Sequence, residues 1–209
     1  NENTAFKTTY VIEEPYVYSA IIEDPTTKEL LYRIIEPTLT VDEKALYDKI
    51  KKILVQELNV DIAELATEKA PLIIEKEVRR IIKEYRMKVD EGVFSKLMYY
   101  FKRDFLGYER VDPMMRDHMI EDISCDGVGI PIYVWHREWE SIPSNVVFDS
   151  EEDLNRNVIR LAYKCGRHLS IGNPILDGSL PDGSRVNATY GSEISRRGAT
   201  FTLRRFRAD

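Results

Sequence analysis

The sequence predicts an α+β fold in which a β-hairpin and a three-helix bundle precede a PAS-like α/β subdomain with an antiparallel sheet. Two β-rich runs lie within the first 35 residues, and three segments with apolar residues at helical spacing follow them. From residue 108 onward, strand-like runs flank one further helix. Because strands and helices are grouped in blocks along the chain, the order of elements favours an antiparallel sheet.

The N-terminal hairpin is predicted from the β-rich runs at residues 16–22 (YVYSAII) and 30–35 (LLYRII). The segment EDPTTKE between them is rich in turn-forming residues, so the two runs are expected to pair.

The three helices are predicted by apolar stripes and by capping residues. Thr40 and Glu43 match a capping box, and Asp90 is a candidate N-cap for the third helix. The stripes contain Leu46, Ile50, Ile53, Leu54 and Leu58; then Ile74, Val78, Ile81, Ile82 and Tyr85; then Phe94, Leu97, Met98, Phe101 and Phe105. We therefore expect a small helical bundle that ends near Gly107.

The second half is predicted to contain six strands and one main helix. The first three strands are DISCDG (122–127), IYVWHR (132–137) and EWESIP (138–143), and Ser150 begins the helix. Three strands close the chain, PILDGSL, SRVNATY and ATFTLRRF, with a tight turn at Asp182-Gly183 before the second of them. The expected domains are therefore residues 1–107 and 108–209.

Charge is distributed unevenly along the chain. The net charge is −6, but residues from 160 onward contain 9 Lys/Arg against 4 Asp/Glu, so the first 159 residues, including the bundle, carry −11. This asymmetry indicates an anionic ligand for the C-terminal part and argues against a polyanion along the whole surface. Cys125 and Cys165 do not form a metal-type or disulfide pattern, and no apolar run spans a membrane, which is typical of a cytoplasmic protein.

Several kinds of catalytic site are not supported by the sequence. It contains no GxxxxGK[ST] phosphate loop and no nucleophile elbow. The three histidines, at 118, 136 and 168, are spaced too irregularly for a metal site. Trp135 and Trp139 are expected to pack on the sheet and not to stack on a ligand.

Arginines gather in the C-terminal hairpin. Every basic residue from 180 to 209 is an arginine, and Arg185 and Arg204 are expected to lie near each other if their strands pair antiparallel. Arg196 and Arg197 lie in the connecting loop. Solvated surface charges or ion pairs would explain such a group. Arginine, however, presents a planar fork that suits phosphate and stays charged wherever it is placed, which favours phosphate binding.

The stretches PILDGSLPDGSR (174–185) and RRGATFTLRRF (196–206) resemble the N-terminal region of archaeal secretion ATPases. This family drives type II/type IV secretion and the assembly of type IV pili and archaella. The resemblance covers nearly the whole chain and is strongest between residues 110 and 207.

The resemblance implies a hexameric ring of two-domain subunits in which a C-terminal RecA-like domain holds ATP and Mg²⁺. That domain is absent from this chain, so the chain is expected to be inactive alone although the parent protein is an ATPase. The implied partners are the RecA-like domain, neighbouring subunits of the homohexamer and a polytopic membrane platform protein, and no nucleic acid. The implied location is the cytoplasmic face of the membrane, as a peripheral protein.

In such proteins, arginines of the N-terminal domain reach the nucleotide phosphates across the interdomain cleft. The motif positions carry this role to Arg185 and Arg204 first. Arg205, Arg197 and Arg196 are secondary candidates, either for the phosphates or for a neighbouring subunit. No residue of the chain completes a catalytic site by itself, and no metal site is expected.

Three other functions compete with this interpretation. The N-terminal half, with its acidic bundle, could be a non-catalytic interaction module that docks the motor to its membrane platform. The arginines could bind nucleic acid, which would make affinity fall steeply with salt. A ligand-sensing PAS-like domain is the third alternative, but residues 120–180 offer no convergent polar groups for it.

Overall fold

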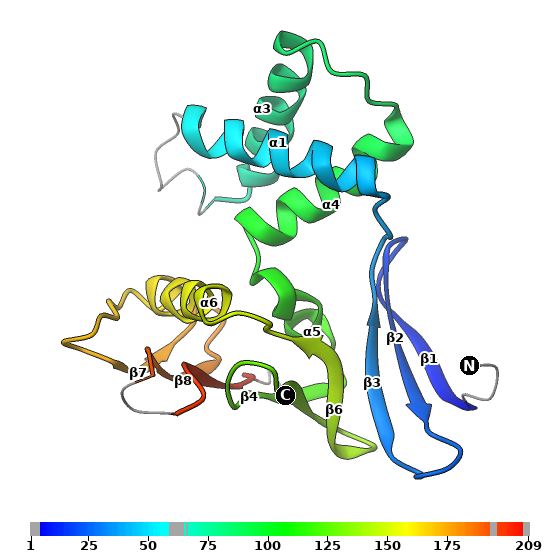
Figure 1. The fold of residues 1–209 in the computed structure, drawn as a ribbon, viewed down its shortest axis with the longest axis vertical. Coiled ribbons are helices and arrows are strands. Elements are labelled where there is room, and N and C mark those ends of the chain that lie inside the picture. Colours follow the sequence, from blue (N-terminus) through cyan, green and yellow to red (C-terminus); the bar gives the residue numbers. More distant parts are fainter. Residues whose placement is uncertain (1–4, 59–64, 66, 193–195, 207–209) are drawn as a thin grey trace. The chain divides into compact units, whose positions relative to one another are not determined.

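The computed structural model describes residues 5–58, 65, 67–192 and 196–206, and the chain divides into two compact units (Figure 1). One unit joins Asn1–Glu36 to Val111–Asp209, and the other is Pro37–Arg110. This differs from the predicted division at residue 107. The N-terminal strands belong with the second half because Tyr32 pairs with Ser144, 112 positions further along the chain.

In the described part of the chain, nine strands form a single sheet in the order β1-β2-β3-β6-β5-β4-β9-β8-β7. All neighbouring strands are antiparallel except β3 and β6, which are parallel. The strands are β1 (Ala5–Glu13), β2 (Val17–Glu23), β3 (Leu30–Ile35), β4 (Ile120–Cys125), β5 (Pro131–His136), β6 (Glu140–Val147), β7 (Ile175–Ser179), β8 (Arg185–Thr189) and β9 (Thr200–Arg204). The α+β class with a mostly antiparallel sheet is therefore confirmed.

The predicted N-terminal hairpin is confirmed as β2 and β3, and a third strand, β1, lies outside it. Every residue of β1 is exposed or half-exposed, and β1 pairs with β2 alone. An edge strand of this kind carries no strong apolar stripe, which is why the sequence pattern did not indicate it.

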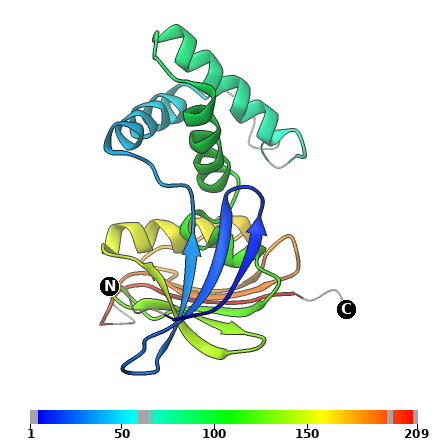
Figure 2. The same ribbon diagram turned by 90° about the vertical axis from the view of Figure 1, so that its right-hand side faces the viewer.

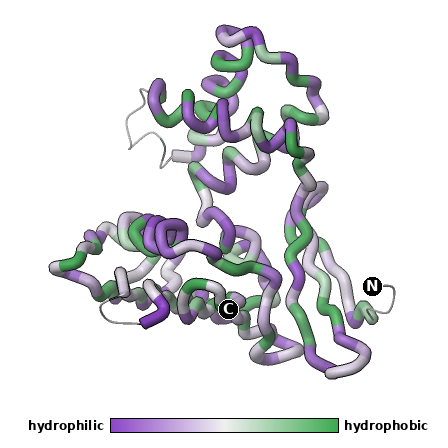
Figure 3. Tube along the Cα trace, in the orientation of Figure 1, coloured by the Kyte–Doolittle hydropathy of each residue, from purple (hydrophilic) through white to green (hydrophobic). Residues whose placement is uncertain are grey.

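Among its described residues, the second unit contains the helices α1 (Val41–Glu57), α3 (Ala70–Glu84) and α4 (Glu91–Phe105). Hydrophobic and hydrophilic residues alternate along them (Figure 3), and their apolar stripes form one core that includes Ile50, Leu54, Ile74, Val78, Ile81, Leu97 and Phe101. The Thr40–Glu43 capping box and the Asp90 N-cap are both present. The three predicted helical stripes are therefore confirmed except at Tyr85, which lies just past the end of α3 and is 44% exposed.

The helical unit is not acidic. Residues 37–110 contain 15 Lys/Arg and 14 Asp/Glu, so the negative charge of the first 159 residues lies in the N-terminal strands and in residues 111–159. The expectation of an acidic bundle was wrong because it averaged the charge over segments that fold into different units.

One face of the sheet is covered by α6 (Glu151–Lys164), which Ser150 caps as predicted (Figure 2). Residues of α6 and of the strands bury their apolar side chains on this side, among them Leu154, Val158, Leu161, Val186, Phe201 and Leu203. A short 3-10 turn (Glu109–Val111) and α5 (Asp112–Arg116) lead into β4.

The alternate residues of β8 and β9 point away from the buried side. In β8 the residues Arg185 and Asn187 are exposed, and in β9 the residues Thr202 and Arg204 are exposed. We call this side the open face of the sheet.

Candidate functional site

The two arginines that rank first as phosphate contacts lie opposite each other on neighbouring strands. Arg185 begins β8, Arg204 ends β9, and the two are partners in the antiparallel ladder. Residues directly opposite in such a ladder share a face and have Cβ atoms about 4.5–5.5 Å apart. Their side chains are 60% and 77% exposed. The expectation that they lie close together is confirmed, and both belong to the open face.

The predicted tight turn sets the position of Arg185. Gly183 adopts a φ of 87°, which glycine tolerates best, and its N–H donates to the carbonyl of Leu180 at 2.9 Å. The Ser184 N–H and hydroxyl both donate to the carboxylate of Asp182, at 2.9 and 3.0 Å. The Phe206 N–H donates to Ser184 Oγ at 3.0 Å, so the turn also fixes the chain just after Arg204.

Each of the two arginines is paired with an aspartate on a flanking strand. Arg185 Nη2 donates to Asp177 Oδ1 on β7 at 3.0 Å, and Arg204 Nε donates to Asp122 Oδ1 on β4 at 3.3 Å. Exposed pairs of this kind contribute little to stability. A guanidinium has five N–H donors, so each arginine keeps donors that an anion can use.

Together these side chains line a shallow pocket of about 400 Å³. Its lining residues are Glu121, Asp122, Gly183, Arg185, Arg204, Arg205 and Phe206.

Arg205 is used differently from its neighbour Arg204. Its Nη1 donates to the backbone carbonyls of Asp117 and Ile120, the latter at 3.1 Å. Burial lowers the pKa of the Arg205 guanidinium below its usual value. Arg205 therefore ties the end of β9 to the start of β4, and these two bonds occupy its Nη1.

The carboxylate of Asp117 lies in a buried hydrogen-bond network that sequence analysis missed. Asp117 Oδ2 accepts from Tyr10 at 2.6 Å and from Tyr32 at 2.7 Å, and the Tyr10 oxygen is 3.1 Å from His136 Nε2. Burial, with Asp117 nearby, raises the pKa of both tyrosines, and burial lowers the pKa of His136. These groups satisfy one another, so the network joins β1, β3 and β5 and serves stability.

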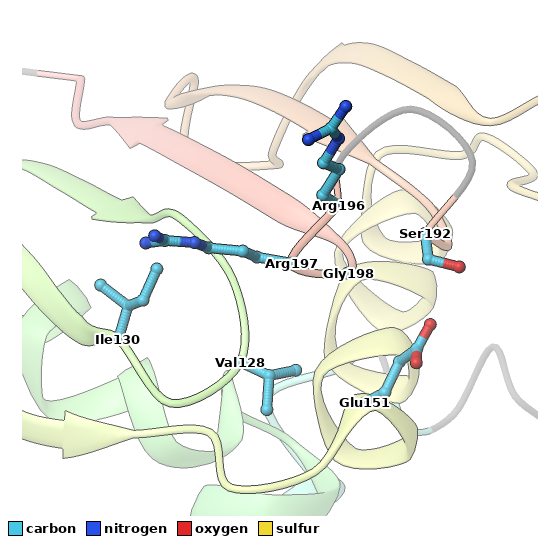
Figure 4. Close-up of a pocket in the computed structure, with 7 residues that line it drawn as sticks. All are labelled: Val128, Ile130, Glu151, Ser192, Arg196, Arg197 and Gly198. Carbon is cyan, nitrogen blue, oxygen red and sulfur yellow. The ribbon is translucent and has the colours of Figure 1, made fainter.

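Arg196 and Arg197 lie at the other end of the β8–β9 hairpin. Both are exposed, and they line a second shallow pocket with Val128, Ile130, Glu151, Ser192 and Gly198 (Figure 4). Figure 4 shows the Arg197 side chain extending toward Ile130 while Arg196 points away from it. Arg204 follows Arg197 by seven positions, which corresponds to about 20 Å of extended chain. One phosphate group therefore cannot contact both pairs in the same chain.

A glycine holds the loop of Arg197 against the β4–β5 turn. A Cβ added at Gly127 would lie 2.6 Å from the backbone oxygen of Arg197, and Gly127 has a φ of 129°. The carbonyl of Arg197 also accepts from the Val128 N–H at 2.9 Å. The backbone at this end is therefore fixed by close approach.

Two further observations limit the chemistry of the chain. Within the residues that the structure describes, no three His, Cys, Asp or Glu side chains are grouped as metal ligands. None of the described helices has both the length and the apolar character needed to cross a membrane.

Sequence comparison assigns the chain to a family of archaeal proteins. It is 40% identical over 172 residues to the uncharacterized protein MJ1288 of Methanocaldococcus jannaschii, an alignment that covers 82% of this chain and 68% of the relative. The chain therefore belongs to the family of MJ1288. No protein-family profile matches it.

Longer relatives occur in the same organism. The uncharacterized protein MJ0900 is 33% identical over 216 residues, and the uncharacterized protein MJ0781 is 37% identical over 92 residues. The alignments cover 94% and 44% of this chain but only 39% and 12% of these relatives. The matching region is thus a minor part of both longer proteins.

Among solved structures, the chain is similar to the VirB11 ATPase from the Brucella suis type IV secretion system. The TM-score is 0.38 at 18% identity, and the match covers 46% of this chain and 29% of VirB11. A similarity of this extent carries no argument about function.

Proposed function

We propose that the chain is the N-terminal domain of a hexameric ATPase that powers protein secretion or the assembly of type IV pili or archaella. Arg185 and Arg204 contact the phosphates of ATP, which a C-terminal RecA-like domain holds together with Mg²⁺. The motifs that contain these two arginines, PILDGSLPDGSR and RRGATFTLRRF, support the proposal.

The observation that carries the proposal is the direct cross-strand placement of two exposed arginines. Like charges opposite each other destabilise an antiparallel sheet, and the exposed pairs with Asp177 and Asp122 offset this only weakly, so stability gives little reason for the arrangement. An anion bound between them removes this repulsion, and the two planar guanidinium groups match the oxygen geometry of phosphate.

The proposed role is to supply positive charge from outside the nucleotide-holding domain. Charge of this kind stabilises the negative charge that develops on the transferred phosphoryl group, and an arginine finger raises turnover by about 10³–10⁵-fold. ATP would also draw the two domains together, and the release of phosphate would weaken that attraction. The nucleotide state would thereby control domain movement in the ring.

Partners and location follow from the same proposal. The RecA-like domain completes the site, neighbouring subunits form the ring, and a polytopic platform protein receives the movement at the cytoplasmic face of the membrane. Arg196 and Arg197, about 20 Å from Arg185 and Arg204, are then available to contact a neighbouring subunit.

The experiment is to measure ATP turnover in the full-length protein. We expect Arg185→Ala and Arg204→Ala each to reduce turnover at least about tenfold, because each removes a charge-assisted hydrogen bond made in the transition state. Arg156→Ala serves as the control. It removes one exposed arginine from α6, the helix that covers the opposite face of the sheet. Wild-type turnover in both test variants would refute the proposal.

A second expectation concerns this chain alone. It should not hydrolyse ATP, because arginines without a phosphate loop supply only part of a site. Steady-state phosphate release by the purified chain, sensitive to Arg204→Ala, would contradict the division of roles between the two domains.

A further inference from the structure

The open face carries an aromatic side chain in the same cross-strand row as the arginine pair. Trp135 on β5 is the partner of Asp122 on β4, Asp122 is the partner of Arg204, and Arg204 is the partner of Arg185. Partners across a sheet share one face, so these four side chains lie side by side on the open face.

Trp135 is not a core residue. It is 43% exposed, whereas its neighbour Val134 is 1% exposed and lies on the covered side. Tyr133, two residues before Trp135 on the same face, is 38% exposed. Packing on the sheet therefore covers only part of the Trp135 side chain, and a large aromatic surface remains in contact with water.

The spacing of the row is set by the sheet. Neighbouring strands are about 4.8 Å apart, so Trp135 lies about 10 Å from Arg204 and about 14 Å from Arg185. Between them stands the carboxylate of Asp122, which accepts from Arg204 at 3.3 Å. The row thus presents an aromatic ring, then a hydrogen-bond acceptor, then two cations.

We propose that this row binds the whole nucleotide and not its phosphates alone: Trp135 stacks on the base, Asp122 accepts a hydrogen bond from the ribose, and Arg204 and Arg185 contact the phosphates. The inference rests on the proposed function and extends it. A nucleoside triphosphate carries a planar base, a ribose with hydroxyl donors and a polyanion in this order. Stacking of a base on an aromatic side chain contributes about 1–3 kcal/mol.

A free nucleotide fits this face better than a nucleic acid does. Asp122, Asp177 and Glu121 lie on or beside the row, and the chain has a net charge of −6. A polymer would need contacts to many phosphates along a positive track. The row offers two arginines that share a face at one point, which matches one short phosphate chain.

Fluorescence tests the aromatic end. The chain has two tryptophans, so Trp139→Phe leaves Trp135 as the only tryptophan, whose emission is excited at wavelengths that tyrosine does not absorb. We expect ATP, titrated into the millimolar range, to quench Trp135 emission, whereas inorganic triphosphate leaves the emission unchanged. We expect Trp135→Leu to weaken ATP binding about tenfold and triphosphate binding not at all. Tyr163→Leu, which removes a 62% exposed aromatic from α6, should leave both unchanged.

The phosphate end is measured in the same samples through the NMR signals of the Arg185 and Arg204 Nε–H groups. If ATP and triphosphate both shift these signals but ATP does not quench Trp135, the nucleotide row is wrong and the phosphate contact stands. If neither ligand shifts them, the nucleotide row is wrong, and the turnover of Arg185→Ala and Arg204→Ala in the full-length protein decides the proposed function separately. Stronger quenching by a single-stranded oligonucleotide than by ATP would overturn the inference in favour of nucleic-acid binding.

Discussion

The β8–β9 hairpin carries two pairs of arginines, one at each end, that are equal in charge and different in geometry. Arg185 and Arg204 come from opposite strands, share the open face and are each held by one aspartate. Arg196 and Arg197 are consecutive in a loop, and their side chains diverge. Two guanidinium groups can act on one phosphate only when the backbone points them in the same direction, and of the two pairs the strand pair has this geometry.

Two arginines that are adjacent in the sequence, Arg204 and Arg205, also differ in their surroundings. Arg204 and Arg205 are adjacent and identical, but Arg204 is 77% exposed whereas Arg205 donates to two backbone carbonyls. Arg204 ends β9, whereas Arg205 lies just beyond the strand and turns toward the start of β4. One arginine is therefore left exposed on the open face, and its neighbour is used by the fold.

The largest effect is expected at the backbone contact that fixes the Arg196–Arg197 end. Gly127→Ala should destabilise the chain by about 3 kcal/mol, because the new Cβ overlaps the Arg197 backbone at a φ that L-residues avoid. Gly129→Ala is the matched control: Gly129 also has a positive φ but has no atom within 4 Å of the added Cβ. Denaturant unfolding measures both. Equal losses would mean that the close approach contributes nothing.

A smaller effect is expected from the neighbouring arginines. Arg205→Ala should cost about 2 kcal/mol of unfolding free energy, because two backbone carbonyls lose a charged donor. Arg204→Ala should change stability by less than about 0.5 kcal/mol, since its side chain is exposed. If Arg204→Ala proved as destabilising as Arg205→Ala, the assignment of one to the ligand and the other to the fold would be wrong.

The smallest effect concerns Asp177 and Asp122, the aspartates that pair with the two strand arginines. Asp122→Asn and Asp177→Asn should each tighten the binding of inorganic triphosphate about two- to threefold, because each removes a weak competitor for a guanidinium. Asp48→Asn removes the same charge from the helical unit and should have no effect. Isothermal titration checks this, and weaker binding in Asp177→Asn would show that the aspartate supports the site instead of competing with it.

Local signals in the sequence predicted local structure well. The Thr40 capping box, the Ser150 cap and the Asp182-Gly183 turn are all present where their residues indicated. The proximity of Arg185 and Arg204 could also be predicted, because one hairpin with a known turn fixes their register.

Long-range pairing could not be predicted in the same way. The bonds from Tyr10 and Tyr32 to Asp117 join residues 107 and 85 positions apart, and no local pattern marks them. The β3–β6 contact, which moves the N-terminal strands out of the helical unit, is equally distant. Nearness in sequence was also misleading, since it grouped five arginines that lie at the two opposite ends of the β8–β9 hairpin.

The most direct test compares the two arginine pairs in this chain by their affinity for inorganic triphosphate. The double variant Arg185→Ala/Arg204→Ala should bind at least about tenfold more weakly than the wild type, because it loses two charge-assisted contacts. The double variant Arg196→Ala/Arg197→Ala has the same net charge and should bind within about twofold of the wild type. Equal weakening in the two variants would contradict the account, because general attraction between charges would then explain the binding without a site.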